Sequence, residues 1–220
     1  MSQIKLYSAR SCPFAHRTRL VLSHKKLQFE LVEVDLQNKP AWFDAKLSGY
    51  GKVPALEHNG QHLWESAVVN EYLDEVFPEP RLLPADPVER ARARIWIDYA
   101  NTRFVGAFGK LLRLPADGDE AAARRELSDA LSFIEKGLSA EGPYFLGAAP
   151  SLVDFAFYPW FERWPALEQL RSFALPSELK RVTRWVAAVR ELPTVREHEN
   201  TPDYYVQRYK SAIAPRKAVA

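Results

Sequence analysis

A proline-rich segment, residues 77–87, divides this sequence into two parts with different patterns. It holds four prolines in eleven residues, and proline fixes φ and cannot donate a backbone hydrogen bond, so the segment neither continues a helix nor enters a sheet. Before it, strand-like alternation is mixed with helical spacing; after it, only helical spacing remains. We therefore expect a first domain of residues 1–78, a linker of residues 79–86 and an all-helical domain of residues 87–220.

The first part has the pattern of a small α/β domain of order βαβαββα. A strand, a helix and a second strand within about 35 residues make a βαβ unit, which usually has parallel strands. Asn59-Gly60 lies between two apolar runs, which predicts an antiparallel hairpin. The expected elements are a strand at 3–8, a helix at 13–26, a strand at 28–36, a short helix at 41–47, strands at 52–58 and 61–64, and a helix from Glu65 to Phe77.

The second part shows three apolar stripes at helical spacing, which predicts a helical bundle. Ser151 and Asp154 have the spacing of a capping box at a helix start, so we assign Asp154 a structural role. The stripes are Ile97, Phe104, Phe108 and Leu111; Leu127, Leu131, Ile134 and Leu138; and Val182, Trp185, Val186 and Val189.

The composition excludes several classes of protein. Thirty basic against twenty-eight acidic residues give a net charge of +2, which is too balanced to favour nucleic acid or an anionic membrane as partner. A single cysteine excludes a disulfide framework and fits a reducing compartment. The sequence shows neither a leader pattern nor an apolar run of about 18 residues. We expect a soluble, cytoplasmic protein.

The single cysteine, Cys12, stands where the first strand passes into the first helix. Pro13 has its φ pre-set for a first helical turn, so Cys12 is expected at the helix N-terminus. Free N–H groups and the helix dipole favour the nucleophilic thiolate there, and Arg17, one turn on, adds positive charge. The alternative is a cysteine that packs as a small apolar residue. Ala15 stands where a Cys-x-x-Cys pair needs its second thiol, so disulfide exchange within the chain is excluded.

The order and spacing of several motifs resemble the cytosolic glutathione transferases, and the omega class among them, whose nucleophile is cysteine. The similarity runs from Ile4 to about Val189 and implies a thioredoxin-like first domain, followed by a helical-bundle domain. The motifs that carry it are Cys12-Pro13-Phe14-Ala15, Asn38-Lys39-Pro40-Ala41-Trp42-Phe43, Val53-Pro54, Glu65-Ser66 and Pro159-Trp160-Phe161-Glu162-Arg163.

The resemblance implies a mixed disulfide between Cys12 and glutathione and a set of glutathione-binding residues: Phe14, Lys39, Val53, Pro54, Glu65 and Ser66. Val53 would present backbone groups to the cysteinyl part, and Pro54 would be cis. Glu65 would meet the γ-glutamyl ammonium and Ser66 its carboxylate, while Lys39 would meet the glycyl carboxylate and Phe14 would pack beside the thiol. From the residues alone, Ser66 is equally a helix cap, Lys39 a solvated surface lysine and Val53-Pro54 an ordinary trans turn.

For a second substrate the resemblance offers Trp160 and Arg163, with Arg103 and Phe104 on the first bundle helix. The two aromatic residues are equally well explained as core. We expect His16, four residues beyond Cys12, to face solvent rather than act as a base. No histidine has metal-ligand spacing, so we expect no metal.

The function that follows is a glutathione-dependent thiol transferase or reductase with glutathione as co-substrate. The class implies thioltransferase activity, dehydroascorbate reductase activity or deglutathionylation of adducts, and the family implies a homodimer. The alternative is a non-catalytic binding or regulatory protein on the same fold. The role of the aromatic stretch from Tyr204 to Tyr209 is left open between a cover for the cleft and packing on the bundle.

Overall fold

The computed structural model describes residues 4–46 and 50–213 of the chain. The part before the proline-rich segment has the expected order, and Gln3 and Leu47 of the expected elements lie outside the described residues. Its elements are β1 (Ile4–Ser8), α1 (Pro13–His24), β2 (Glu30–Glu33), α2 (Ala41–Lys46), β3 (Ala55–His58), β4 (Gln61–Trp64) and α3 (Ser66–Val76).

The four strands form one mixed sheet in the order β2-β1-β3-β4. β1 pairs parallel with β2, as a βαβ unit requires, and antiparallel with β3. Asn59 and Gly60 take positive φ values of 50° and 79°, and His58 pairs with Gln61 across them, so the predicted hairpin is confirmed. The strand expected at 52–58 begins only at Ala55, because Pro54 has no N–H to donate to a ladder.

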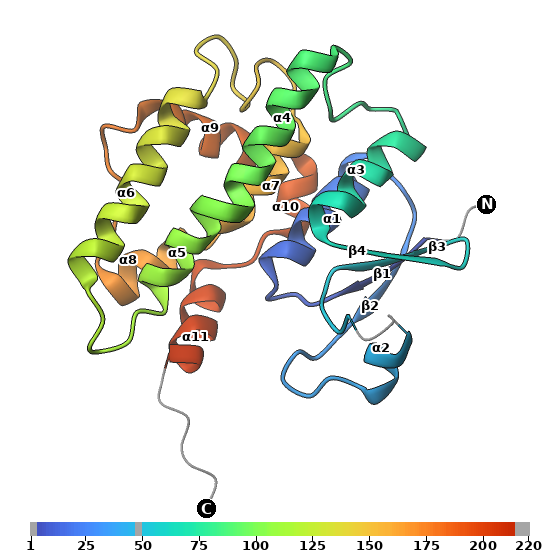
Figure 1. Ribbon diagram of the computed structural model, residues 1–220, viewed down its shortest axis with the longest axis horizontal. Helices are drawn as coiled ribbons and strands as arrows, with labels where there is room; N and C mark the ends of the chain where they lie inside the picture. The colour runs from blue at the N-terminus through green and yellow to red at the C-terminus, as the bar shows by residue number, and fades with distance from the viewer. Residues whose placement is uncertain (1–3, 47–49, 214–220) are drawn as a thin grey trace, which may run out of the picture.

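After the proline-rich segment the named elements are all helical (Figure 1), as expected. A π-helical turn, Ala100–Phe104, joins α4 to α5 within one continuous helix. The helices are α4 (Pro87–Tyr99), α5 (Val105–Leu112), α6 (Glu120–Gly137), α7 (Leu152–Glu162), α8 (Trp164–Arg171), α9 (Lys180–Arg190), α10 (Pro193–His198) and α11 (Pro202–Ile213).

The predicted capping box at the start of α7 is confirmed. The Ser151 N–H and hydroxyl both donate to Asp154 Oδ2 at 2.7 Å. The other oxygen of Asp154 accepts hydrogen bonds from the Phe145 N–H and from Trp185 Nε1. Asp154 is fully buried, and its four partners explain why a carboxylate can stay there: each oxygen is satisfied.

Hydrogen bonds and a buried ion pair hold the proline-rich segment against α1 and α3. Lys25 Nζ donates to the carbonyls of Phe77 and Pro80 and pairs with Asp74 at 2.7 Å. The Asp74 carboxylate in turn accepts from the N–H groups of Leu82 and Leu83, which are buried. A single apolar cluster contains residues of β1 and α1, these two leucines, and residues of the helices that follow the proline-rich segment. The boundaries at 78 and 86 stay a prediction.

α1 lies at the centre of the molecule (Figure 1), in contact with α3, α7 and α10 as well as the sheet. This position overturns the expectation for His16, which is fully buried rather than facing solvent. Its Nδ1 lies 3.6 Å from Glu162 Oε2 and 3.5 Å from Arg163 Nη1, both on the α7 side. Burial, and then the positive charge of Arg163, lower the pKa of His16 well below 6.5, so the ring is neutral.

Candidate functional site

Cys12 lies directly before α1, as the sequence predicts. Its N–H closes a turn onto the Ala9 carbonyl at 2.9 Å, and Pro13 is the first helical residue. The side chain is half-buried, and Sγ donates to the Val53 carbonyl at 3.6 Å. The free N–H groups of the first turn therefore lie beside a thiol that solvent and small molecules reach.

The loop before β3 brings the Val53 backbone to this thiol. The Val53-Pro54 peptide bond is cis, as the resemblance implies, and both residues are buried. Lys39, which precedes α2, is exposed, and its Nζ donates to the carbonyl of Gly51 at 3.0 Å. The predicted residues Lys39, Val53 and Pro54 thus meet at one loop next to Cys12.

Glu65 and Ser66 form the N-terminus of α3. Glu65 occupies the cap position with a positive φ of 66°, and its exposed carboxylate accepts from the Tyr50 hydroxyl. Ser66 is the first helical residue, after the cap position, and makes no capping hydrogen bond within the described residues, so the interpretation of Ser66 as a helix cap is wrong. Its hydroxyl accepts from Arg17 instead, at 3.3 Å. An outward carboxylate and a helix N-terminus side by side suit a zwitterionic amino-acid group.

Arg17 occupies the space behind Cys12 and Ser66 and is fully buried. It donates to the Ala156 carbonyl at 2.9 Å and to Asn101 Oδ1 at 2.6 Å, and its Nη2 has no partner among the residues that the structure describes. Its guanidinium carbon lies 4.5 Å from the ring centroid of Trp160. Burial lowers the pKa of Arg17 to about 9, and the negative charge of a Cys12 thiolate acts against that shift. At neutral pH the group is a fixed cation near the sulfur.

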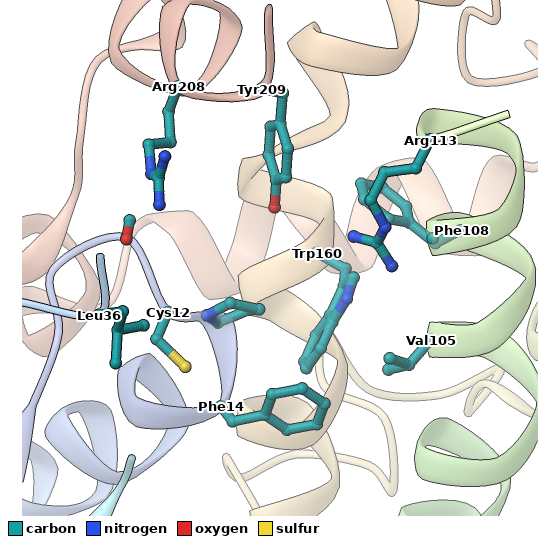
Figure 2. Close-up of a pocket in the computed structure, with 12 residues that line it drawn as sticks. Cys12, Phe14, Leu36, Val105, Phe108, Arg113, Trp160, Arg208 and Tyr209 are labelled. Carbon is teal, nitrogen blue, oxygen red and sulfur yellow. The ribbon is translucent and has the colours of Figure 1, made fainter. Parts of the chain in front are cut away.

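A cavity of about 320 Å³ opens on the other side of Cys12 (Figure 2). Phe14 packs edge-on against Trp160, with ring centroids 5.1 Å apart, and both side chains line it. Trp160, a predicted second-substrate residue, and Phe14, predicted to pack beside the thiol, thus both lie at the cavity, and their roles stay predictions. Cys12 lines the cavity, and its Sγ contacts the Val53 carbonyl, so a molecule in the cavity meets the same side chain that lies against this loop.

Three predicted second-substrate residues lie elsewhere. Phe104 is fully buried and stacks on Phe161 at 5.3 Å, because it belongs to the apolar stripe that packs against α7. Arg103 lines a different hollow, with Glu126 and Asp129. Arg163 is buried beneath the site: it donates to the Ser11 carbonyl at 3.4 Å and lies over the Tyr205 ring, so it supports the Cys12 loop from behind.

The sequence reasoning missed most of the cavity wall. Val105, Phe108, Gly109 and Arg113 recur at i, i+3, i+4 and i+8 along one helix face, a signal that resembles an ordinary core stripe.

Arg208 and Tyr209 come from α11, within the stretch whose role was left open. Tyr209 lines the cavity, and Tyr205 packs in the core. Burial raises the pKa of Tyr209, so its hydroxyl is neutral. The remaining wall residues are Ser11, Pro13 and Leu36.

Two further findings bear on the class of site. In the part of the chain that the structure describes, no three His, Cys, Asp or Glu side chains gather where they could hold a metal ion. Among residues 4–46 and 50–213, no helix combines the length and apolarity needed to cross a membrane.

Comparison with known proteins finds similarity to glutathione S-transferases over most of the chain. Residues 11–76 match the family model for the glutathione S-transferase N-terminal domain, and residues 88–188 match that for the C-terminal domain. The chain is 35% identical over 198 residues to glutathione S-transferase omega-1 of Mus musculus, which covers 90% of this chain and 80% of the relative.

Two solved structures extend the similarity to the fold. Glutathione transferase Omega 2C from Trametes versicolor has a TM-score of 0.83 at 27% identity, covering 98% of this chain and 100% of that one. Rice GST1, solved in complex with glutathione, has a TM-score of 0.89 at 27% identity, covering 99% of each chain.

Proposed function

Because the chain belongs to the glutathione S-transferase family, as an omega-like member, we propose that it is a glutathione-dependent thiol transferase or reductase acting through a mixed disulfide at Cys12. The observation that carries this proposal is the position of the one cysteine: at a helix N-terminus, half-buried, against the Val53 carbonyl and open to a cavity. A cysteine kept only for packing would not need a side chain that opens to a cavity.

Glutathione is placed on the sheet side of Cys12 in this proposal. The backbone of Val53, shaped by Pro54, holds the cysteinyl part, and Phe14 packs beside the sulfur. Glu65 meets the γ-glutamyl ammonium, and the Ser66 hydroxyl with the first N–H groups of α3 meets the carboxylate. Lys39 meets the glycyl carboxylate. The Lys39 contact to Gly51 and the outward carboxylate of Glu65 support this arrangement.

The reaction uses one protein thiol. The Cys12 thiolate attacks the glutathione sulfur of a mixed disulfide, that S–S bond breaks, and the substrate thiolate leaves with the electron pair and takes a proton from water. A second glutathione thiolate then attacks the glutathione sulfur of the Cys12 adduct, which releases oxidised glutathione and restores the Cys12 thiolate. Since the chain has no other cysteine, an intramolecular disulfide cannot compete.

Reduction and adduct removal rank above conjugation, because a cysteine nucleophile forms the disulfide with glutathione itself. Mixed disulfides, dehydroascorbate and glutathionyl adducts of aromatic ketones are the candidate substrates. The second candidate function, a non-catalytic binding protein of this fold, requires Cys12 to be unreactive.

The homodimer and cytoplasmic location belong to the same proposal. Val68 on α3 and Ile95 on α4 are 59% and 65% exposed, and such apolar side chains are usually covered by a partner when they lie together. Sedimentation equilibrium gives the mass of the particle and decides between one chain and two.

The test is the intact mass of the protein after incubation with oxidised glutathione. We expect a gain of one glutathione, reversed by reduced glutathione and absent from the Cys12→Ala variant, with alkylation of Cys12 still fast at pH 6. A thiol that stays unmodified and alkylates slowly would make the enzyme proposal wrong and leave the binding protein.

A further inference from the structure

The cavity beside Cys12 is small, and its wall is mainly apolar, with four aromatic side chains. Phe14, Phe108 and Trp160 supply rings from three different helices. At about 320 Å³ it is near the lower end of small-molecule sites, which run from roughly 300 Å³ upwards. The space therefore suits one or two substituted aromatic rings that stack on the wall, with a bond to sulfur directed at Cys12.

Two arginines give this aromatic cavity a positive charge. Arg113 follows α5 and Arg208 lies on α11, and Figure 2 shows both side chains directed into the cavity from opposite sides of Tyr209. Within the described residues, neither guanidinium has a carboxylate as ion-pair partner, whereas Arg92 and Arg94 on α4 do. The nearby Tyr209 hydroxyl is neutral. Arg113 is exposed and Arg208 half-buried, so solvent screens part of their attraction for an anion, and the apolar rings of the cavity reduce that screening.

Gly109 gives the Arg113 side chain room along α5. A Cβ on Gly109 would overlap the Arg113 Nη2 atom, so the glycine leaves the space in which this guanidinium folds back across α5 to the cavity. Gly109 itself lines the cavity one helical turn before Arg113. A glycine in a helix interior costs stability, and here its absent side chain makes room for a charge.

We propose that the second substrate is an anionic aromatic molecule, whose ring fills the cavity and whose carboxylate or sulfonate is bound by Arg113 and Arg208. This inference rests on the proposed function, since it names the substrate class of the same site. For an aryl mixed disulfide, Cys12 attacks the glutathione sulfur, the S–S bond breaks, and the arenethiolate leaves into the cavity with the electron pair. A second glutathione thiolate then releases oxidised glutathione from Cys12.

The test compares two chromogenic mixed disulfides of glutathione: one with 5-thio-2-nitrobenzoate and one with 4-nitrothiophenol, which lacks the carboxylate. Each kcat/KM is divided by the rate constant of the uncatalysed reaction with glutathione, which removes the difference in leaving group. We expect the wild type to favour the anionic disulfide at least tenfold, about the effect of one charge-assisted hydrogen bond.

Arg113→Gln and Arg208→Gln should each lower kcat/KM for the anionic disulfide about tenfold and leave the neutral one within about twofold. Arg125→Gln, an exposed arginine on α6, is the matched control.

The outcomes separate this inference from the proposed function. If both disulfides lose rate equally and the KM for glutathione rises, the arginines bind the incoming glutathione and the inference is wrong. If the variants match the wild type, it is also wrong. If the wild type turns over neither disulfide, the proposed function fails, and calorimetric titration of the Cys12→Ala protein with 2-naphthoate and 2-naphthamide decides the inference. Tighter binding of the naphthoate, lost in the two arginine variants, supports it; equal binding overturns it.

Discussion

The buried guanidinium of Arg17 donates a hydrogen bond from Nη1 to the Ser66 hydroxyl over 3.3 Å. This contact joins α1, which carries Cys12 at its start, to α3, which begins at Ser66. The same guanidinium reaches the Ala156 carbonyl on α7. One side chain therefore fixes the thiol, the proposed carboxylate site of glutathione and the helical part of the chain relative to one another.

Arg17→Met should weaken both the fold and the thiol. Its three hydrogen-bond acceptors would lose a charged donor, so we expect the free energy of unfolding in urea to fall by about 2–4 kcal/mol. The cation near Cys12 would also go, so alkylation of the folded protein at pH 6 should slow severalfold. Arg17→Lys keeps the charge and should recover much of the alkylation rate but not the stability. Equal alkylation rates in all three proteins would show that the charge does not act on Cys12.

Glu65→Gln should raise the KM for glutathione about tenfold, because the ammonium of the γ-glutamyl group would lose its carboxylate. The carboxylate is exposed and removed from the sulfur side of the site, so alkylation of Cys12 by iodoacetamide should not change. Tyr50→Phe, which removes the hydroxyl that donates to Glu65 but keeps the carboxylate, is the matched control and should stay within about twofold of the wild type. A KM for glutathione that is unchanged in Glu65→Gln would remove this residue from the site.

Acid should destabilise the protein through His16. Its pKa is lowered in the folded state by burial, so below the ordinary value of about 6.5 only the unfolded chain binds the proton. The free energy of unfolding therefore falls as pH drops below 6.5, by about 1.4 kcal/mol at pH 5.5 for this one group. Burial raises the pKa of Glu162 above 4.5 in the folded state. Between pH 4.5 and that raised pKa, the folded protein binds a proton that the unfolded chain does not, so Glu162 opposes the loss of stability.

The His16 contribution is isolated by comparing urea unfolding at pH 7.5 and pH 5.5 in the wild type and in His16→Gln. The variant should lose about 1.4 kcal/mol less than the wild type over that interval, whatever its stability at pH 7.5. The same loss in the wild type and in His16→Gln would mean that His16 takes up a proton while folded.

Two helical glycines should respond oppositely to alanine. A Cβ on Gly106 in α5 would meet no atom within 4 Å, so Gly106→Ala should stabilise the fold by about 0.5–1 kcal/mol. A Cβ on Gly137 at the end of α6 would overlap the Trp96 ring, so Gly137→Ala should cost about 1–3 kcal/mol. Thermal unfolding of the two variants beside the wild type measures the difference. Stabilisation by both would mean that Trp96 moves aside freely.

The sequence predicted those features that depend on neighbouring residues. The hairpin at Asn59-Gly60, Pro13 at the first helical position and the capping box of Asp154 are each set by contacts within a few residues, and all three are confirmed. The cis bond before Pro54 came from the family resemblance rather than from the residues, because proline alone favours trans.

The polar residues of α1 show where this reasoning ends. His16 was expected to face solvent, yet it is buried together with Arg17 and Arg19, because α1 is covered by the sheet and by helices from the far end of the chain. Their charges and polar groups find partners such as the Ala156 carbonyl and the Ser8 hydroxyl, which no local pattern reveals.

The sequence by itself determined the elements of the first part, their order and the placement of Cys12 at a helix start, since periodicity, proline and capping act over short stretches of chain. Only the tertiary structure decided what surrounds that cysteine. Val105, Arg113 and Arg208 meet across one cavity although about a hundred residues separate the first from the last, and Phe104, next to Val105, is turned into the core. A stripe of apolar residues at helical spacing shows only that one face of the helix is apolar. Whether another helix or a cavity covers that face depends on how segments distant in the sequence pack together.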